Sequence, residues 1–372
     1  MNLTLKTNQE TSSRMSSYPL SLRRRLALEA WRRLKKERVK EHRLSQLMWE
    51  CTLRCNLNCR HCGSDCHKES ATPDMPLKDF LGVLENIKSH TDPNKVFVII
   101  TGGEPLMRPD LEQCGKAIFD MGFPWGMVTN GMAMTQKRFR ALLAAGMHTA
   151  TVSLDGPRDE HNFMRGNSRS FDNAVEAIRM MGKHPNFIFD VVTCVNRRNL
   201  TQLDQIKELL VSLGVKQWRL FSIFPTGRAA EDPDLQLSKE EFRAMLDYIK
   251  QNRKEESRIT LSYGCEGFLG NYEGDVRKFF FSCNAGVNVA SVLVDGSISA
   301  CSSIRSDYHQ GNIYEDDFWE VWNNRFEPYR NREWMRKGEC ADCSMFRYCE
   351  GNGMHLRDND GNLLFCHLDR IK

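Results

Sequence analysis

Apolar and polar residues follow one another along the chain in a pattern that predicts alternating strands and helices. Between residues 46 and 224, short apolar runs are each followed by a longer stretch, several with helical periodicity. Since no hairpin turn separates neighbouring strands, the sheet is predicted to be parallel. Six such units are too few for an eight-stranded barrel and predict an open, partial (β/α)6 barrel of the TIM type. The expected strands are 46–50, 96–101, 125–129, 148–154, 187–195 and 217–224, and the expected helices are 110–121, 135–145, 171–181 and 200–213.

The pattern changes on both sides of this region. Residues 1–20 are polar and rich in Ser and Thr, which predicts a disordered start. Residues 22–47 have the pattern of an amphipathic helix with ten Lys or Arg against three Glu. Such a basic helix suits nucleic acid, a membrane surface or an acidic peptide, or it packs its apolar stripe on the main domain. After residue 230, a linker and a helix at 239–252 lead to a cysteine-rich end. The predicted division is 1–44, 45–230, 231–262 and 263–372.

Composition narrows the class of protein. The 372 residues, 41% hydrophobic and 27% charged, are those of a globular protein with one large and one smaller domain. A net charge of +4 is too small to imply a polyanionic partner such as nucleic acid for the whole molecule. Because the chain has no signal-peptide core and no apolar run of bilayer length, we expect a cytoplasmic location. Fourteen cysteines in a reducing compartment then predict metal or cluster ligation.

Three cysteines, Cys55, Cys59 and Cys62, lie within eight residues directly after the first expected strand. Parallel α/β folds place their chemistry at such strand ends. Three thiolates leave one position of a metal centre open, which suits an iron–sulfur cluster whose unique iron binds a ligand. His61 and Cys66 would instead complete a zinc site, so zinc is an alternative.

Small and polar residues follow the next three strands. Each group alone is typical of a turn, but together they predict a binding site at the same edge as the cysteines. Adjacent glycines let the backbone approach a ligand closely, a carboxylate suits an ammonium group, and small polar side chains suit ribose hydroxyls and a carboxylate. The candidate binding residues are Gly102, Gly103, Glu104, Pro105, Asn130, Ser153 and Asp155.

The motif Cys-x3-Cys-x2-Cys, followed by Gly-Gly-Glu-Pro, resembles the radical S-adenosylmethionine enzymes over about residues 45–230. The resemblance implies a partial (β/α)6 barrel and a [4Fe–4S] cluster on Cys55, Cys59 and Cys62. This cluster would chelate the amino and carboxylate groups of S-adenosylmethionine, and residues 102–105 would hold the ammonium. It also implies ribose contacts from Ser153 and Asp155, and Arg165 near the methionine carboxylate. The implied reaction is cleavage of the cofactor to methionine and a 5′-deoxyadenosyl radical that takes hydrogen from a substrate.

The C-terminal cysteines form a second pattern. Residues 292–301 are typical of a hairpin with an Asp-Gly turn, which would bring Cys301 back towards Cys283. A tight Cys-x2-Cys-x5-Cys run follows. These spacings resemble the SPASM domain, which carries auxiliary clusters in radical enzymes that modify peptides and proteins. The resemblance implies Cys340, Cys343, Cys349 and Cys366 for the second auxiliary cluster, and Cys283, Cys301 and Cys265 for the first.

One position departs from the SPASM pattern. The family pattern continues Cys-x3-Cys, but four residues after Cys349 this chain has Gly353. The first auxiliary cluster is then open to substrate or water, or is ligated by a non-cysteine group such as His355. It is alternatively a [2Fe–2S] centre, or absent. Zinc on the second set of cysteines is a further alternative.

The resemblance implies an oxidoreductase that modifies a peptide or small protein, with one or two auxiliary clusters and an electron donor such as flavodoxin or ferredoxin. An anaerobic sulfatase maturase that forms formylglycine is an alternative. Gly353 weakens it, because such maturases resemble the full seven-cysteine pattern. A non-catalytic zinc-binding adaptor is the alternative outside the enzymes.

Overall fold

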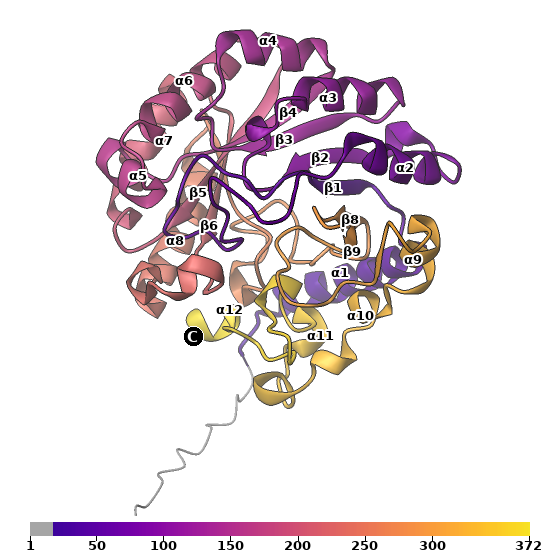
Figure 1. The fold of residues 1–372 in the computed structure, drawn as a ribbon. Helices are drawn as coiled ribbons and strands as arrows, with labels where there is room; N and C mark the ends of the chain where they lie inside the picture. Colours follow the sequence, from indigo (N-terminus) through magenta and orange to yellow (C-terminus); the bar gives the residue numbers. More distant parts are fainter. Residues whose placement is uncertain (1–17) are drawn as a thin grey trace, which may run out of the picture.

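A ten-stranded sheet forms the centre of the computed structural model, which describes residues 18–372. Its first seven strands are parallel and adjacent in chain order, which confirms the predicted open barrel. Figure 1 shows the strands curving around the interior, with helices on the outside. The seven strands are β1 (Gln46–Glu50), β2 (Phe97–Thr101), β3 (Trp125–Thr129), β4 (Met147–Ser153), β5 (Ile188–Val195), β6 (Gln217–Ser222) and β7 (Thr260–Tyr263).

The outer helices begin and end close to the expected residues. They are α3 (Leu111–Asp120), α4 (Gln136–Ala144), α6 (Ser170–Gly182), α7 (Leu203–Ser212) and α8 (Lys239–Glu255). The helix α8 starts at a capping box, in which Ser238 and Glu241 each accept a hydrogen bond from the other's backbone N–H. The hydrophobic pattern did not predict α2 (Leu77–Lys88), α5 (Arg158–Arg165) or the strand β7.

Side chains alternate along β1 between the outer helices and the barrel interior. Leu47 and Trp49 are fully buried towards the helices, and Trp49 stacks on Phe80 of α2 with 4.3 Å between ring centroids. Because successive side chains of a strand point to opposite faces, Met48 and Glu50 face the barrel interior. Glu50 is buried there and pairs with Arg305 at 2.7 Å.

The C-terminal region continues the same sheet. The strand β8 (Val289–Val292) pairs with β1 in parallel, on the side opposite β2. The strands β9 (Ser297–Ser299) and β10 (Gly311–Asn312) then add antiparallel neighbours. This confirms the expected hairpin, whose turn places Gly296 at φ +87°. The remaining helices are short: α9 (Phe318–Asn324), α10 (Glu327–Arg330), α11 (Phe346–Cys349) and α12 (His367–Arg370).

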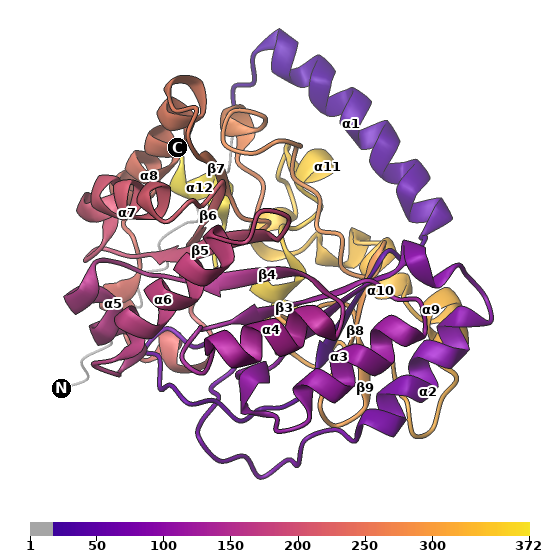
Figure 2. The same cartoon turned by 90° about the horizontal axis from the view of Figure 1, so that it is seen from above.

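The basic helix α1 (Leu22–Glu41) ends earlier than the expected residue 47, because His42 has φ 29° and β1 begins at Gln46. Figure 2 shows it along the edge of the molecule, on the side of α10 and α11. Its buried Lys35 pairs with Glu350 at 2.7 Å, so it packs on the C-terminal region. The disorder expected for residues 1–20 falls, up to residue 17, outside the described residues. None of the helices in the described part of the chain is long and apolar enough to cross a membrane.

Candidate functional site

A cavity of about 130 Å³ lies at the C-terminal ends of the first four strands. The structure brings most of the expected residues together around it. Pro105 and Asp155 are buried but do not line this cavity. The expected residues that do line it are Cys55, Cys59, Cys62, Gly102, Gly103, Glu104, Asn130, Ser153 and Arg165.

The two glycines allow the end of β2 to lie directly on the cysteine loop. A Cβ atom on Gly102, which has φ +144°, would lie 2.1 Å from the carbonyl oxygen of Thr52. A Cβ atom on Gly103 would lie 2.5 Å from the carbonyl oxygen of Arg54. Instead, the N–H of Gly103 donates to the Thr52 carbonyl at 2.8 Å. The glycines therefore position the loop that carries the cysteines, in addition to bordering the cavity.

Glu104 is a fixed acceptor in the cavity wall. Its carboxylate accepts hydrogen bonds from the Thr129 hydroxyl at 2.7 Å, the Asn130 N–H at 2.7 Å and the Leu106 N–H at 3.1 Å. Burial raises the pKa of Glu104, and these hydrogen bonds oppose that rise. A carboxylate has about four lone-pair sites, so one remains for a cation in the cavity.

Hydrogen-bond donors surround the three cysteines. The Arg165 guanidinium lies 3.6 Å from Cys59 Sγ, and the Asn130 amide lies 3.8 Å from Cys55 Sγ. Arg228 donates from Nε to the Cys59 carbonyl at 2.8 Å. Burial raises the pKa of Cys55 to about 12, so binding a metal at this thiol must displace its proton. Donors placed in this way are typical of the surroundings of iron–sulfur clusters.

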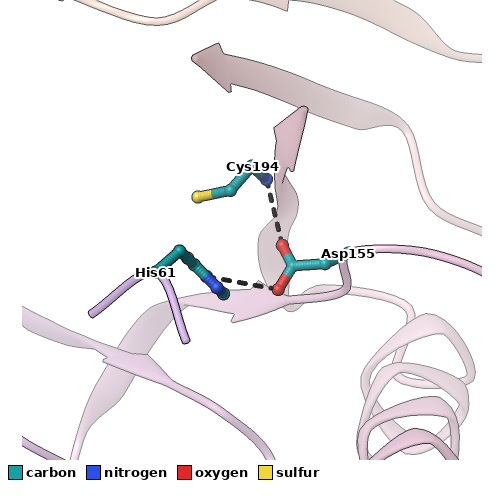
Figure 3. Close-up of side chains that lie close together, drawn as sticks. All are labelled: His61, Asp155 and Cys194. Carbon is teal, nitrogen blue, oxygen red and sulfur yellow. Dashed lines mark hydrogen bonds and ion pairs between the residues drawn. The ribbon is translucent and has the colours of Figure 1, made fainter. Parts of the chain in front are cut away.

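Asp155 belongs to a buried network beside the cavity, part of which is drawn in Figure 3. Its carboxylate pairs with Arg165 at 2.7 Å and His61 at 3.4 Å, and accepts the Cys194 N–H at 3.0 Å. Burial favours a higher pKa for Asp155, but Arg165, His61, His161 and the Cys194 N–H together outweigh it, so the pKa lies below its ordinary value. Burial also lowers the pKa of His61 to about 4.

This network positions Arg165. Sequence reasoning considered His61 only as a zinc ligand and assigned no functional role to Cys194, so it missed their contact with Asp155. The ligand atoms of these three side chains lie within 4.8 Å of one another. Arg165 already neutralises the Asp155 carboxylate, which disfavours a further cation there. The expected contact of Asp155 with ribose stays a prediction.

The C-terminal cysteines gather in two groups. Cys349 interacts electrostatically with the other three members of the second auxiliary set. In the same way, Cys265 interacts with Cys283 and Cys301. Arg357 lies 3.4 Å from Cys340 Sγ, and the Asn352 N–H lies 3.2 Å from Cys349 Sγ. The structure therefore assembles both sets implied by the SPASM spacing: Cys340, Cys343, Cys349 and Cys366, and Cys265, Cys283 and Cys301.

Comparisons with known proteins agree with this geometry. The family model described as the Radical SAM superfamily matches residues 49–210, and the SPASM iron–sulfur cluster-binding domain matches residues 283–344. The AdoMet-dependent heme synthase of Methanosarcina barkeri is 28% identical over 323 residues, which cover 82% of this chain and 90% of that protein. Among solved structures, Streptococcus suis SuiB bound to S-adenosylmethionine shares the fold. Its TM-score is 0.66 at 17% identity, and the match covers 86% of this chain and 76% of SuiB.

A further relative is the mycofactocin maturase MftC of Mycolicibacterium smegmatis. It is 30% identical over 319 residues, which cover 83% of this chain and 77% of that protein. The three cysteines of the cavity lie in the first matched domain, and Cys283, Cys301, Cys340 and Cys343 of the auxiliary sets lie in the second. This chain therefore belongs to the radical SAM superfamily, as an iron–sulfur enzyme that uses S-adenosylmethionine and carries auxiliary clusters in a C-terminal SPASM domain.

Proposed function

We propose that this enzyme binds S-adenosylmethionine in the cavity at the barrel edge and abstracts hydrogen from a peptide or small protein. The observation that carries the proposal is the convergence of three thiols, a glycine-rich strand end and buried Glu104 on one cavity. When bound there, the cluster and S-adenosylmethionine supply the reductive cleavage that yields a 5′-deoxyadenosyl radical. Membership of the superfamily argues against the alternative of a non-catalytic zinc-binding adaptor.

Different residues of the cavity bind different groups of S-adenosylmethionine. Glu104 accepts the ammonium group of the methionine moiety, because its carboxylate is already held by three protein donors. Arg165, held by Asp155 and adjacent to Cys59, presents a positive charge to the methionine carboxylate. Asn130 and Ser153 border the same cavity and suit the ribose hydroxyls. Such fixed partners keep the radical close to the substrate and away from water.

A peptide substrate is supported by the SPASM domain and by the relative named as a mycofactocin maturase. The electron donor, of the flavodoxin or ferredoxin type, and the cytoplasmic location stay predictions. Formylglycine formation stays the weaker alternative within this class, because Gly353 departs from the full cysteine pattern.

A carboxylated tetrapyrrole is the second candidate substrate, and one pocket favours it. This pocket, of about 660 Å³, lies between α1, the strands β6 and β7, and residues 277–284, and Cys265 contributes to its wall. Aromatic faces can stack on a flat macrocycle, and cations pair with its carboxylates. Relatives named as heme synthases agree with this candidate. The pocket is lined by Arg38, Arg219, Arg253, Arg277 and Lys278 and by Trp31, Tyr263, Phe279, Phe280 and Phe281.

The test is cleavage of S-adenosylmethionine by anaerobically reconstituted protein with a strong reductant, followed as 5′-deoxyadenosine by mass spectrometry. We expect about eight to twelve irons per chain if each cluster is of the [4Fe–4S] type. Replacing Cys55, Cys59 and Cys62 together by Ala should abolish 5′-deoxyadenosine formation and leave the C-terminal iron in place. Cys114→Ala, in the buried core of α3, is the matched control and should retain cleavage. Cleavage that persists in the triple variant would refute the assignment.

The same assay separates the substrate classes. Candidate peptides encoded beside the gene and iron coproporphyrin are each added, and the modified product is sought by mass spectrometry. A peptide product supports the first candidate. A porphyrin product, lost in Lys278→Glu, supports the second and contradicts the first.

A further inference from the structure

Gly353 occupies the position where the SPASM pattern has a cysteine, and steric crowding explains why it has no side chain. Its φ of −69° and ψ of 142° are open to any residue, so backbone conformation does not require glycine. A Cβ atom here would lie 2.6 Å from Cε1 and 2.8 Å from Nδ1 of His355, and 2.7 Å from the carbonyl oxygen of Glu266. The imidazole of His355 therefore lies where a cysteine side chain at residue 353 would begin.

The imidazole of His355 is fixed by packing, but one of its two nitrogens has no hydrogen-bond partner. The short 3₁₀ turn η9 (Met354–Leu356) carries it, and its ring packs on Phe224 with 4.9 Å between ring centroids. Its Nε2 atom is buried and has no hydrogen-bond partner among residues 18–372. A buried imidazole nitrogen without a partner is costly. Metal ligation would remove that cost, because neutral imidazole is a common ligand.

The turn also adjoins the first auxiliary set of cysteines. The backbone of Met354 interacts electrostatically with the Cys283 thiol. On the other side, the carbonyl that borders Gly353 belongs to Glu266, the residue after Cys265. Cys265 in turn interacts with Cys283 and Cys301. The segment that carries His355 thus approaches a set of three thiols that lacks its fourth cysteine.

We propose that His355 Nε2 is the fourth protein ligand of the auxiliary cluster held by Cys265, Cys283 and Cys301. The ligand set of that cluster is then three thiolates and one imidazole. Replacing a thiolate by a neutral nitrogen makes a cluster less negative, and histidine ligands raise the reduction potential of Rieske centres in this way. The proposal rests on the SPASM assignment and on neither candidate substrate.

Pulsed electron paramagnetic resonance tests the bond directly. The protein is labelled with ¹⁵N-histidine in the Cys55→Ala, Cys59→Ala, Cys62→Ala background, so that the signals of the reduced protein come from the C-terminal clusters. We expect a strong ¹⁵N coupling that disappears in His355→Gln. His367→Gln is the matched control, because His367 is a buried histidine of the same region whose Nε2 already has a partner in Tyr263 at 3.0 Å.

His355→Cys gives an independent readout if the Gln variant loses its cluster. The new thiolate should restore the iron content, abolish the ¹⁵N coupling and lower the midpoint potential of one C-terminal cluster. An absent coupling in the labelled parent, or one that survives in His355→Gln, overturns the proposal. Loss of the coupling in His367→Gln alone would assign the bond to the other histidine and also overturn it. None of these outcomes depends on substrate turnover, so they are distinguishable from failure of the proposed function.

Discussion

Asp155 determines the electrostatics behind the cavity that Cys55, Cys59 and Cys62 line. Its side chain is fully buried, and it is the carboxylate that pairs with buried Arg165. Because Arg165 lies beside Cys59, the ion pair places one fixed positive charge next to a thiol that must become a thiolate. The ionised Asp155 carboxylate thus holds the Arg165 guanidinium in its position beside Cys59.

Asp155→Asn should therefore be strongly destabilising. Removing one partner of a buried ion pair leaves the other charge uncompensated, at a cost of roughly 3–5 kcal/mol. Urea unfolding of the metal-free protein measures this loss. Asp190→Asn is the control, because its partner Arg219 is 39% exposed, and it should cost about 1 kcal/mol or less. Equal losses in the two variants would contradict the assigned role.

The ion pair of Asp155 and Arg165 predicts that the free energy of unfolding depends on pH. The folded-state pKa of Asp155 is depressed, so its stabilising contribution is present above the unfolded value of about 3.9. It is lost as the pH falls through the folded value. The difference in unfolding free energy between the parent and Asp155→Asn should therefore shrink below about pH 4. A difference that stays constant from pH 7 to pH 3 would show that the ion pair is not its source.

At the scale of elements, we expect the contact between the end of β2 and the cysteine loop to decide whether a cluster can form on Cys55, Cys59 and Cys62. Gly103→Ala places a Cβ atom 2.5 Å from the Arg54 carbonyl, so the loop must shift. We expect this variant to lose the iron of the core cluster and its binding of S-adenosylmethionine. Gly82→Ala on α2 meets nothing within 4 Å and should keep both. Iron analysis and equilibrium binding check the result, and a fully loaded Gly103→Ala protein would contradict it.

Elements with a regular apolar period were predictable, and elements held by paired polar groups were not. The six strands and the hairpin carry their signal locally. The helix α2 is an exception, because it carries an apolar period in Phe80, Leu84 and Ile87 and was still not among the expected helices. The helix α5 buries His161 and Arg165 together with Met164, so no apolar stripe marks it.

The candidate site likewise contains residues that short motifs predict and contacts that only the fold creates. Cys55, Cys59, Cys62 and Glu104 belong to short motifs, and the structure brings them together as predicted. The pairing of His61 with Asp155 was not predictable, because the two residues are far apart in the chain and meet only in the fold. For the same reason, no local pattern shows that β8 lies beside β1.

At the scale of the whole molecule, the two functional regions share one sheet. The strand β1 lies between β2 and β8, so the strand that precedes the core cysteines pairs with the first strand of the hairpin that leads to Cys301. The ion pair of buried Glu50 with partly exposed Arg305 adds a second link across this contact. The auxiliary-cluster region is therefore held at a fixed position relative to the barrel edge.

A chain that ends at residue 262 should consequently fail to fold as a soluble barrel. It would expose the edge of β1 that pairs with residues 289–292, and a long unpaired edge favours aggregation. Removal of residues 1–43 is the control, because it takes away α1 and leaves every strand paired. Solubility and size-exclusion chromatography compare the two. A monomeric, folded 1–262 protein would contradict this expectation.

The position of β1 also affects biosynthesis. The ribosome releases β1 early, yet its second neighbour emerges only after residue 289 has been synthesised. Until then the nascent barrel keeps an open edge beside the loop that must receive the first cluster. Delivery of iron and sulfide is therefore best timed after translation ends, and chaperones that shield the emerging chain should increase the yield of fully loaded enzyme.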